Sequence, residues 1–236
     1  LCMNNSKQMV LACHMYLADN YDEFPGSVHG GQASNPTPND PDGPWVVGWL
    51  DWSTSEDNTN VNYLIDPQYS KLANYFSNTK NLFKCPADKY LSPAQRGLGW
   101  TERVRSLSGS IGVGSGNAET GPWDGNIYKH VTKMSAIIYP SPSEAWIYVD
   151  EHPDSMNDAG LFSPRNNQWI DLPASYHNGA CGFAFIDGHS EIKKWVQPDT
   201  QRPVRVADFS ATTAQQPQVD YEWMVYHTVR LTDAIR

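Results

Sequence analysis

Residues 181–195, which read CGFAFIDGHSEIKKW, carry the strongest local structural signal in the chain. An apolar run ends at Asp187 and Gly188, and a second strand-like run follows them. An Asp-Gly pair supplies the positive φ angles of a tight turn, so the two runs are predicted to form an antiparallel hairpin. A two-residue turn would place Phe183 opposite Ile192 on a shared buried face. This stretch therefore predicts a β-sheet that ends in a hairpin.

Periodicity and turn residues predict the other elements around this hairpin. Apolar residues recur at three-, four- and seven-residue steps over residues 1–20, which is typical of an amphipathic helix. The run AWIYV at 145–149 lies between prolines and is typical of a strand. A short helix is expected over 66–78, and the apolar cluster at 221–226 fits either a helix or a strand. One helix followed by strands, without regular βαβ alternation, predicts an α+β fold.

Composition limits the classes of protein that this chain can belong to. Its 236 residues are 39% apolar and 18% charged, which excludes disordered, collagen-like and long coiled-coil chains. The net charge is −9 and the basic residues are scattered, so nucleic acid is not an expected partner. The longest apolar stretch has about ten residues, whereas a membrane-spanning helix needs about 20. No basic leader is visible, so we expect a longer precursor.

A single domain over residues 1–236 is expected, since a chain of this length can bury a substantial core. The helix would occupy 1–20. Residues 26–130 are rich in glycine, proline, asparagine and serine and are expected to form a loop-rich insertion. The sheet with its hairpin is expected within 131–196, and 197–236 would be a C-terminal extension.

Three motifs together resemble one known family. His177 precedes Asp187 and Gly188 with nine residues between, in the string SYHNGACGFAFIDGHSEIKKW. The opening CMNNSKQMVLACHMYLADNYDEFPG and the internal LFKCPAD are the other two motifs. The chain thus resembles bacterial pilin-like proteins with a prepilin-type processing-associated H-X9-DG region, which are related to the pseudopilins of type II secretion.

The resemblance implies a helix packed on an antiparallel sheet. It also implies a basic leader, a prepilin-peptidase site and an apolar helical half upstream of Leu1, which would anchor the precursor in the inner membrane. Other pilin-like subunits would bind through that missing helix. The expected location is the periplasm or the cell surface. We therefore expect a non-enzymatic, exported subunit of a secretion apparatus or surface filament.

The four cysteines, Cys2, Cys13, Cys85 and Cys181, show no C-x-x-C spacing, which disfavours zinc-ribbon and thioredoxin chemistry. Their connectivity cannot be deduced from spacing. Cys2 and Cys85 lie in motifs shared with the family described above, so the resemblance implies a disulfide between them. Cys13 and Cys181 would then be buried free thiols.

A dense set of oxygen donors follows the strand expected at 145–149. Such carboxylates are the ligands that Ca²⁺ requires, and related pseudopilins hold calcium, so a Ca²⁺ site is one hypothesis. The spacing does not match an EF-hand loop, and a solvated acidic loop is the alternative. The candidate ligands are Asp150, Glu151, Asp154 and Asp158.

His177 either braces the hairpin through a backbone carbonyl or serves as a ligand or catalytic group, whereas turn geometry alone explains Asp187. Two other functions remain open. The first is a carbohydrate-binding surface module, and the second is a metal-dependent hydrolase that combines the acidic loop with His177 and His189. The tryptophans that could stack on sugar rings, rather than bury loops, are Trp45, Trp49, Trp52 and Trp123.

Overall fold

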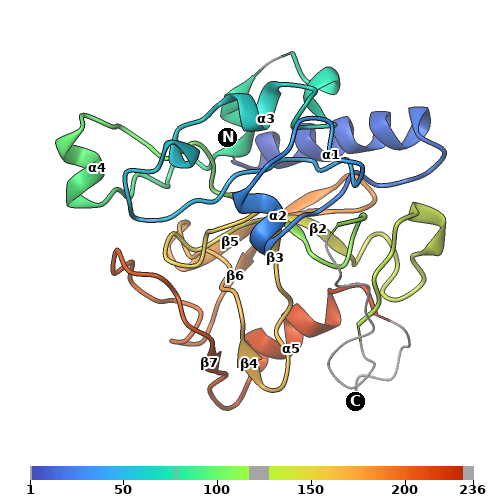
Figure 1. Cartoon of the computed structure of the whole chain (residues 1–236). Coiled ribbons are helices and arrows are strands. Elements are labelled where there is room, and N and C mark those ends of the chain that lie inside the picture. Colours follow the sequence, from blue (N-terminus) through green and yellow to red (C-terminus); the bar gives the residue numbers. More distant parts are fainter. Residues whose placement is uncertain (1, 78, 117–127, 231–236) are drawn as a thin grey trace.

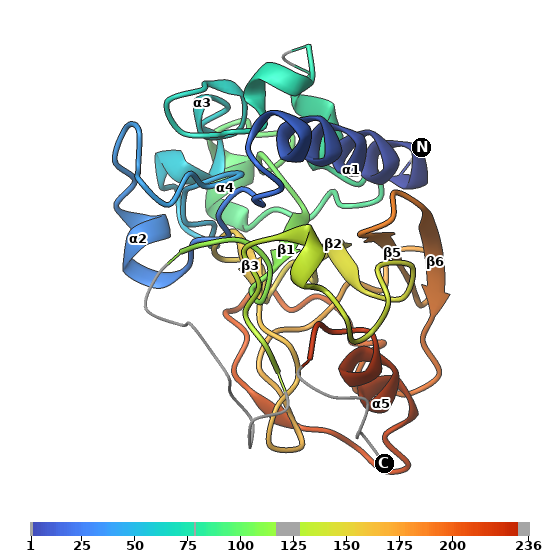
Figure 2. The same ribbon diagram turned by 90° about the vertical axis from the view of Figure 1, so that its right-hand side faces the viewer.

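The computed structural model describes residues 2–77, 79–116 and 128–230 (Figure 1). A five-stranded sheet with the strand order β3-β1-β2-β5-β6 lies at the centre. Helix α1 (Cys2–Asp19) covers one face of this sheet and α5 (Val219–Tyr226) lies on the other side (Figures 1 and 2). The predicted α+β class is confirmed. The strands are β1 (Leu107–Ser110), β2 (Trp146–Asp150), β3 (Gly160–Leu161), β5 (Ala180–Phe185) and β6 (Ser190–Lys194).

The sheet is mixed, which corrects the antiparallel sheet implied by the resemblance. Strand β1 pairs antiparallel with β2 but parallel with β3, where Gly109 lies opposite Gly160. Strand β2 runs against β1, and the chain reverses once more between 150 and 160, so β3 runs in the same direction as β1. Strand β1 also belongs to the region 26–130, so the sheet takes one strand from the segment that was expected to be loop-rich.

Smaller elements surround the sheet. The helix expected over 66–78 does not form in the described part, 66–77, where the 3₁₀ helix η2 (Ala73–Tyr75) lies, and Asp66, which precedes Pro67, is extended. A residue before proline avoids the helical region, so the predicted helix cannot begin at Asp66. The other α-helices among the described residues are α2 (Gly30–Ser34), α3 (Asn62–Ile65) and α4 (Pro93–Gly97). Short 3₁₀ helices are η1 (Glu56–Asn58), η2 (Ala73–Tyr75), η3 (Lys80–Phe83) and η4 (Met134–Ala136). A second sheet pairs β4 (Gln168–Trp169) with β7 (Thr212–Thr213).

The hairpin between β5 and β6 forms, but its predicted register is wrong by one residue. Phe183 lies opposite Glu191, and Ile192 lies opposite Gly182. The loop has three residues, 186–188, because the backbone N–H of Phe185 donates to the carbonyl of His189 at 2.9 Å. A one-residue shift moves side chains to the other face of a strand, so Ile192 is 46% exposed.

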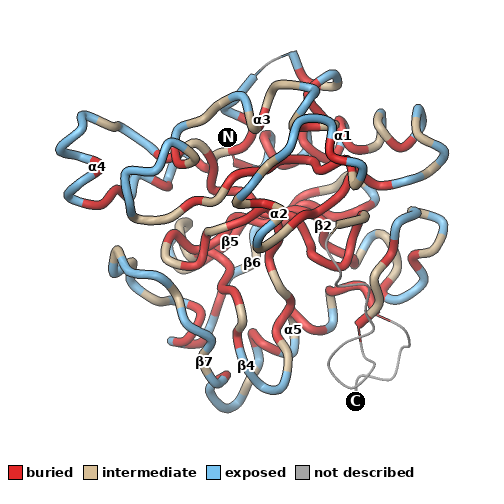
Figure 3. The backbone as a smooth tube through the Cα atoms, in the orientation of Figure 1, coloured by how far each residue is buried: buried red, intermediate tan, exposed pale blue. Residues whose placement is uncertain are grey.

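Strand β5 is buried on both faces, which explains its continuous apolar sequence. Ala184 packs in the same cluster as Met9 and Cys13 of α1. Phe183 and Phe185 point to the opposite side and belong to a second cluster that includes residues of α5. A small side chain thus faces the long helix and large rings fill the other side. The buried backbone runs through the middle of the molecule in Figure 3.

The cluster at 221–226, which fitted either a helix or a strand, forms helix α5. Its buried residues Tyr221, Met224 and Val225 follow helical spacing and pack beneath the sheet. No described helix combines the length and the apolar character that a bilayer crossing requires.

Gly188 has φ of +99°, as predicted, whereas Asp187 lacks the positive φ that a two-residue turn also requires. We expect Gly188→Val to lower the free energy of unfolding by about 1–2 kcal/mol. This loss comes from the unfavourable backbone conformation and not from a steric clash, because the atom nearest to an added Cβ, in His14, is 3.5 Å away. Gly31→Val is the matched control, since Gly31 has an ordinary φ and open space around it. Equal thermal melts for Gly188→Val and the wild type would contradict the assigned turn.

Candidate functional site

Four side chains from distant parts of the chain meet in one small cluster. Among the described residues, Cys2, Cys85, Asp150 and His177 are the group of potential metal ligands whose donor atoms all lie within 4.8 Å of one another. Cys2 opens α1, Cys85 follows η3, Asp150 ends β2 and His177 precedes β5. We call this group the thiol cluster.

The first turn of α1 is fixed to the loop that carries Cys85. The side-chain amide of Asn5 donates to the backbone carbonyls of Asn81 and Lys84, at 2.9 and 3.2 Å. The backbone N–H of Cys85 donates to the hydroxyl of Ser106 at 2.7 Å. These bonds hold the backbones of both cysteines, so their sulfur atoms face each other.

The other half of the thiol cluster depends on the pairing of β2 with β5. Val149 lies opposite Phe183, which places Asp150 beside Gly182. A Cβ on Gly182 would lie 2.9 Å from Oδ2 of Asp150, so glycine leaves room for this carboxylate. The backbone N–H of His177 donates to the carbonyl of Ala180 at 3.1 Å and sets the imidazole at the start of β5.

The donor atoms are close and mostly buried. The Sγ atoms of Cys2 and Cys85 are 2.7 Å apart, and Nε2 of His177 lies 3.5 Å from Sγ of Cys85. The same nitrogen is 3.9 Å from Oδ2 of Asp150. Asp150 is 2% exposed and its Oδ2 accepts no hydrogen bond from the described residues, whereas the side chain of His177 is 26% exposed. The thiol cluster therefore has one side open to solvent at His177.

Burial controls the protonation of the thiol cluster. It raises the pKa of Asp150 well above its usual range, and nearby Cys85 adds to this effect. Burial also lowers the pKa of His177. The hydrogen bond between the two thiols, in which either sulfur can be the donor, lowers the pKa of Cys2 and, together with burial, raises the pKa of Cys85. A neutral imidazole beside two adjacent sulfurs suits either thiol oxidation or metal ligation.

The structure does not bring the four predicted calcium ligands together. Glu151 accepts hydrogen bonds from the hydroxyls of Ser108 and Ser155. Asp158 accepts hydrogen bonds from two backbone amides, those of Gly30 and Gly160. These carboxylates are occupied with structural partners.

Asp154 also binds backbone, at 205–207. The N–H groups of Arg205, Val206 and Ala207 donate to its carboxylate at 2.8, 2.9 and 3.3 Å. Val206 has φ of +58°, an unfavourable value for a β-branched residue, and these bonds help to hold it there. Of the four predicted ligands, Asp150 alone belongs to a group of clustered metal donors in the described part of the chain.

The two halves of the H-X9-DG pattern lie at opposite ends of β5. Asp187 and Gly188 form the turn, where the carboxylate of Asp187 lies 2.6 Å from Nδ1 of His189. The imidazole of His189 stacks on Phe185. His177 is about a strand length away, roughly 20 Å for six residues. The structure thus does not join His177 and His189 in the hydrolase site considered from the sequence.

The structure gives packing partners for two of the four tryptophans considered for sugar stacking, Trp45 and Trp52. Trp45 is 1% exposed and packs against Phe83 and Tyr148. Trp52 stacks on the guanidinium of Arg103 at 4.3 Å, and Trp49 is half-buried. Trp123 lies outside the described residues. Burial thus accounts for Trp45, in agreement with the structural alternative.

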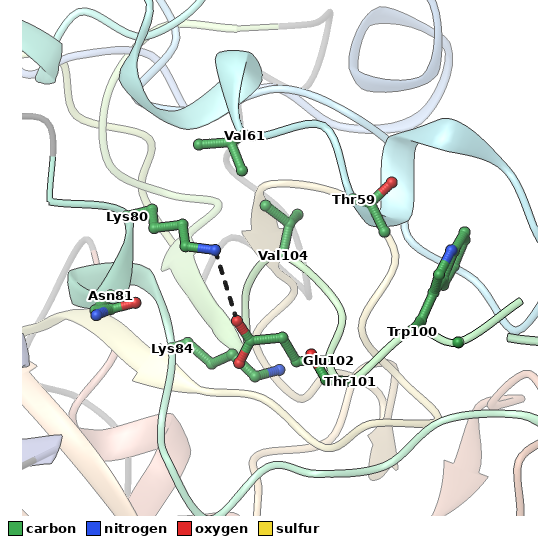
Figure 4. A pocket seen from close by; sticks show the side chains of 10 residues that line it. Thr59, Val61, Lys80, Asn81, Lys84, Trp100, Thr101, Glu102 and Val104 are labelled. Atoms are coloured by element: carbon green, nitrogen blue, oxygen red, sulfur yellow. Dashed lines mark ion pairs between the residues drawn. The ribbon is translucent and has the colours of Figure 1, made fainter. Parts of the chain in front are cut away.

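A polar groove of about 230 Å³ lies near the loop that follows η3 (Figure 4). Lys80 and Glu102 face each other across it, with Nζ and Oε1 3.8 Å apart. Trp100 and Val104 also line it. The sequence alone did not indicate this groove, because most of its residues, apart from Lys84 in the LFKCPAD motif, come from segments without a recognisable motif.

A family model described as a protein of unknown function (DUF1559, SBP_bac_10) matches residues 1–141. The chain belongs to the DUF1559 family. This bacterial family is grouped with secreted, pilin-like proteins, in agreement with the class expected from the sequence. The DUF1559 match includes Cys2 and Cys85 and ends before Asp150 and His177. No curated protein and no solved structure matches the chain.

We expect Asp154→Ala to destabilise this DUF1559 protein by about 1.5–3 kcal/mol, because three backbone amides lose a charged acceptor. The loss should be the same in excess EDTA and in millimolar Ca²⁺. Thermal melts of the variant and the wild type in both solutions provide the measurement. A rise in the wild-type melting temperature with Ca²⁺ that Asp154→Ala abolishes would instead support calcium binding by this loop.

Cys2 and Cys85 are predicted to form the disulfide when the reduced protein is treated with oxidised glutathione. The chain-entropy model gives a stabilisation of about 4–5 kcal/mol for a loop of this length, which spans 83 residues. Peptide mapping should find this bridge, with Cys13 and Cys181 alkylated only after unfolding. The gain in melting temperature on oxidation should persist in Cys13→Ser and vanish in Cys2→Ser. A bridge to any other cysteine would refute the pairing.

Proposed function

We propose that this protein is a non-enzymatic, exported, pilin-like subunit of a secretion apparatus or surface filament. The observation that carries the proposal is the position of α1, which lies along the sheet with one face packed and the other exposed (Figure 2). Membership in the DUF1559 family supports export and a pilin-like role. The expected partners are other pilin-like subunits.

The exposed face of α1 carries large apolar side chains. Met3, Leu11 and Met15 are 37%, 59% and 46% exposed, and they are spaced by multiples of four residues. Residues four apart lie on the same side of a helix, so Leu11 and Met15 form one short apolar stripe, and Met3 lies roughly 80° from Leu11 around the helix axis, at the edge of the exposed face. Apolar side chains along one exposed face favour contact with another helix over contact with water. Packing of α1 against a neighbouring subunit would bury this stripe.

In this proposal an apolar segment upstream of Leu1 continues the helix and anchors the precursor in the inner membrane. A prepilin peptidase removes a basic leader, and the apolar segment then packs among other subunits. The globular part, with its sheet and loops, faces the periplasm or the cell surface. The net charge of −9 keeps this exposed part hydrophilic.

Processing of the natural full-length precursor provides the first test. We expect the precursor to become shorter in bacteria that contain prepilin peptidase and to remain unprocessed in a strain that lacks this enzyme. Immunoblotting of membrane fractions and N-terminal sequencing measure the outcome. Cleavage in both strains at an ordinary secretory signal would overturn the proposal and favour a freely secreted module.

Substitutions on the exposed face of α1 provide the second test. Leu11→Lys and Met15→Lys should reduce the cross-linking of subunits in the membrane by about tenfold or more, because a charge would be buried at the contact. Leu98→Lys is the matched control, since this leucine is 61% exposed and lies outside α1. Thermal melts should be unchanged in all three variants. Normal cross-linking of the double variant would exclude this face as the contact.

A further inference from the structure

We propose that Cys2, Cys85, Asp150 and His177 bind a tetrahedrally coordinated Zn²⁺ ion in the reduced protein. The inference rests on the thiol cluster and stands independently of the pilin-like role. It also assigns a function to His177, which defines the H-X9-DG pattern and which subunit assembly does not use.

The donor set selects the metal. Two thiolates, one imidazole and one carboxylate are the ligands found in zinc sites, whereas Ca²⁺ takes oxygen ligands. Thiolates also disfavour Mg²⁺, which prefers carboxylates and water. The chemistry of the thiol cluster thus differs from that of the calcium site that the acidic residues after β2 suggested from the sequence.

The distances fit a tetrahedral ion after a small movement of the sulfurs. Zinc bonds of about 2.3 Å to sulfur and 2.0–2.2 Å to nitrogen or oxygen place neighbouring ligand atoms roughly 3.3–3.8 Å apart. His177 Nε2 lies 3.5 Å from Cys85 Sγ and 3.9 Å from Asp150 Oδ2, close to that range. The sulfurs, 2.7 Å apart, must separate by about 1 Å, which rotation of the cysteine side chains provides.

An independent observation points to a ligand at this place. Oδ2 of Asp150 is buried and accepts no hydrogen bond from the described residues, although buried polar atoms nearly always have a partner. Gly182 leaves the space next to this oxygen free of a side chain. A metal ion between the carboxylate and the imidazole would satisfy the oxygen. The exposed edge of His177 provides a path for the ion to enter.

Four protein ligands fill a tetrahedral coordination sphere, so the ion would be structural rather than catalytic. It would connect the start of α1 with the loop after η3, the end of β2 and the segment before β5. Binding to the folded state alone raises stability by mass action. A disulfide between Cys2 and Cys85 uses the same two sulfurs, so the oxidised protein would not bind the ion at this site.

The test uses the whole chain with all four cysteines reduced by a phosphine, which is then removed without oxygen. Titration with Co²⁺ should give one equivalent per chain, with thiolate-to-cobalt charge-transfer absorption and the strong visible bands of tetrahedral coordination. Zn²⁺ should displace Co²⁺ and raise the melting temperature. Circular dichroism verifies that each sample is folded.

Variants assign the ligands. Cys85→Ser should lower the charge-transfer absorption by about half or more, because one of two thiolates is lost. His177→Ala, at a partly exposed position, should weaken Zn²⁺ binding by at least about tenfold. Cys13→Ser is the matched control, because Cys13 is a buried cysteine of α1 that lies outside the thiol cluster. This variant should retain the full signal. Absence of stoichiometric metal in the reduced, folded wild type would overturn the proposal, and so would an unchanged affinity in His177→Ala.

Discussion

The burial of strand β5 on both faces holds the rest of the structure together. The small side chain of Ala184 lets α1 approach one face of the strand closely. On the other face, Phe183 and Phe185 fill the space between the sheet and α5. Large apolar area is removed from water on both sides, which makes this strand the centre of the hydrophobic stabilisation. Because β2 pairs with β5 and α1 packs against it, the ends of these elements are also held at fixed positions.

The thiol cluster is a consequence of that arrangement. The first turn of α1, the end of β2 and the start of β5 lie at one edge of the packed layers, and the loop after η3 closes over them. Short side chains such as those of cysteine and aspartate can meet only where backbones are positioned accurately. The hydrogen bonds of Asn5 and Ser106 supply that accuracy for the two cysteines.

The two chemical states of the thiol cluster exclude each other and depend on the surroundings. Oxidising compartments favour a disulfide, which would constrain the unfolded chain over a long loop. Reducing conditions leave thiolates that prefer a soft metal ion. In both states the start of α1 is bound to the body of the protein. The exposed apolar face of the same helix then extends from a fixed base, which suits a helix that packs against neighbouring subunits.

The sequence by itself determined the α+β class, the N-terminal helix, the strand at 145–149 and the glycine turn at 188, because these follow from local periodicity and turn chemistry. It also singled out Cys2, Cys85, Asp150 and His177, but as members of three unrelated hypotheses. Only the tertiary structure decided that they meet, that the hairpin loop has three residues and that Asp154 serves backbone amides. These outcomes depend on strand pairing and helix packing between residues far apart in the chain, which leave no periodic signal in the sequence.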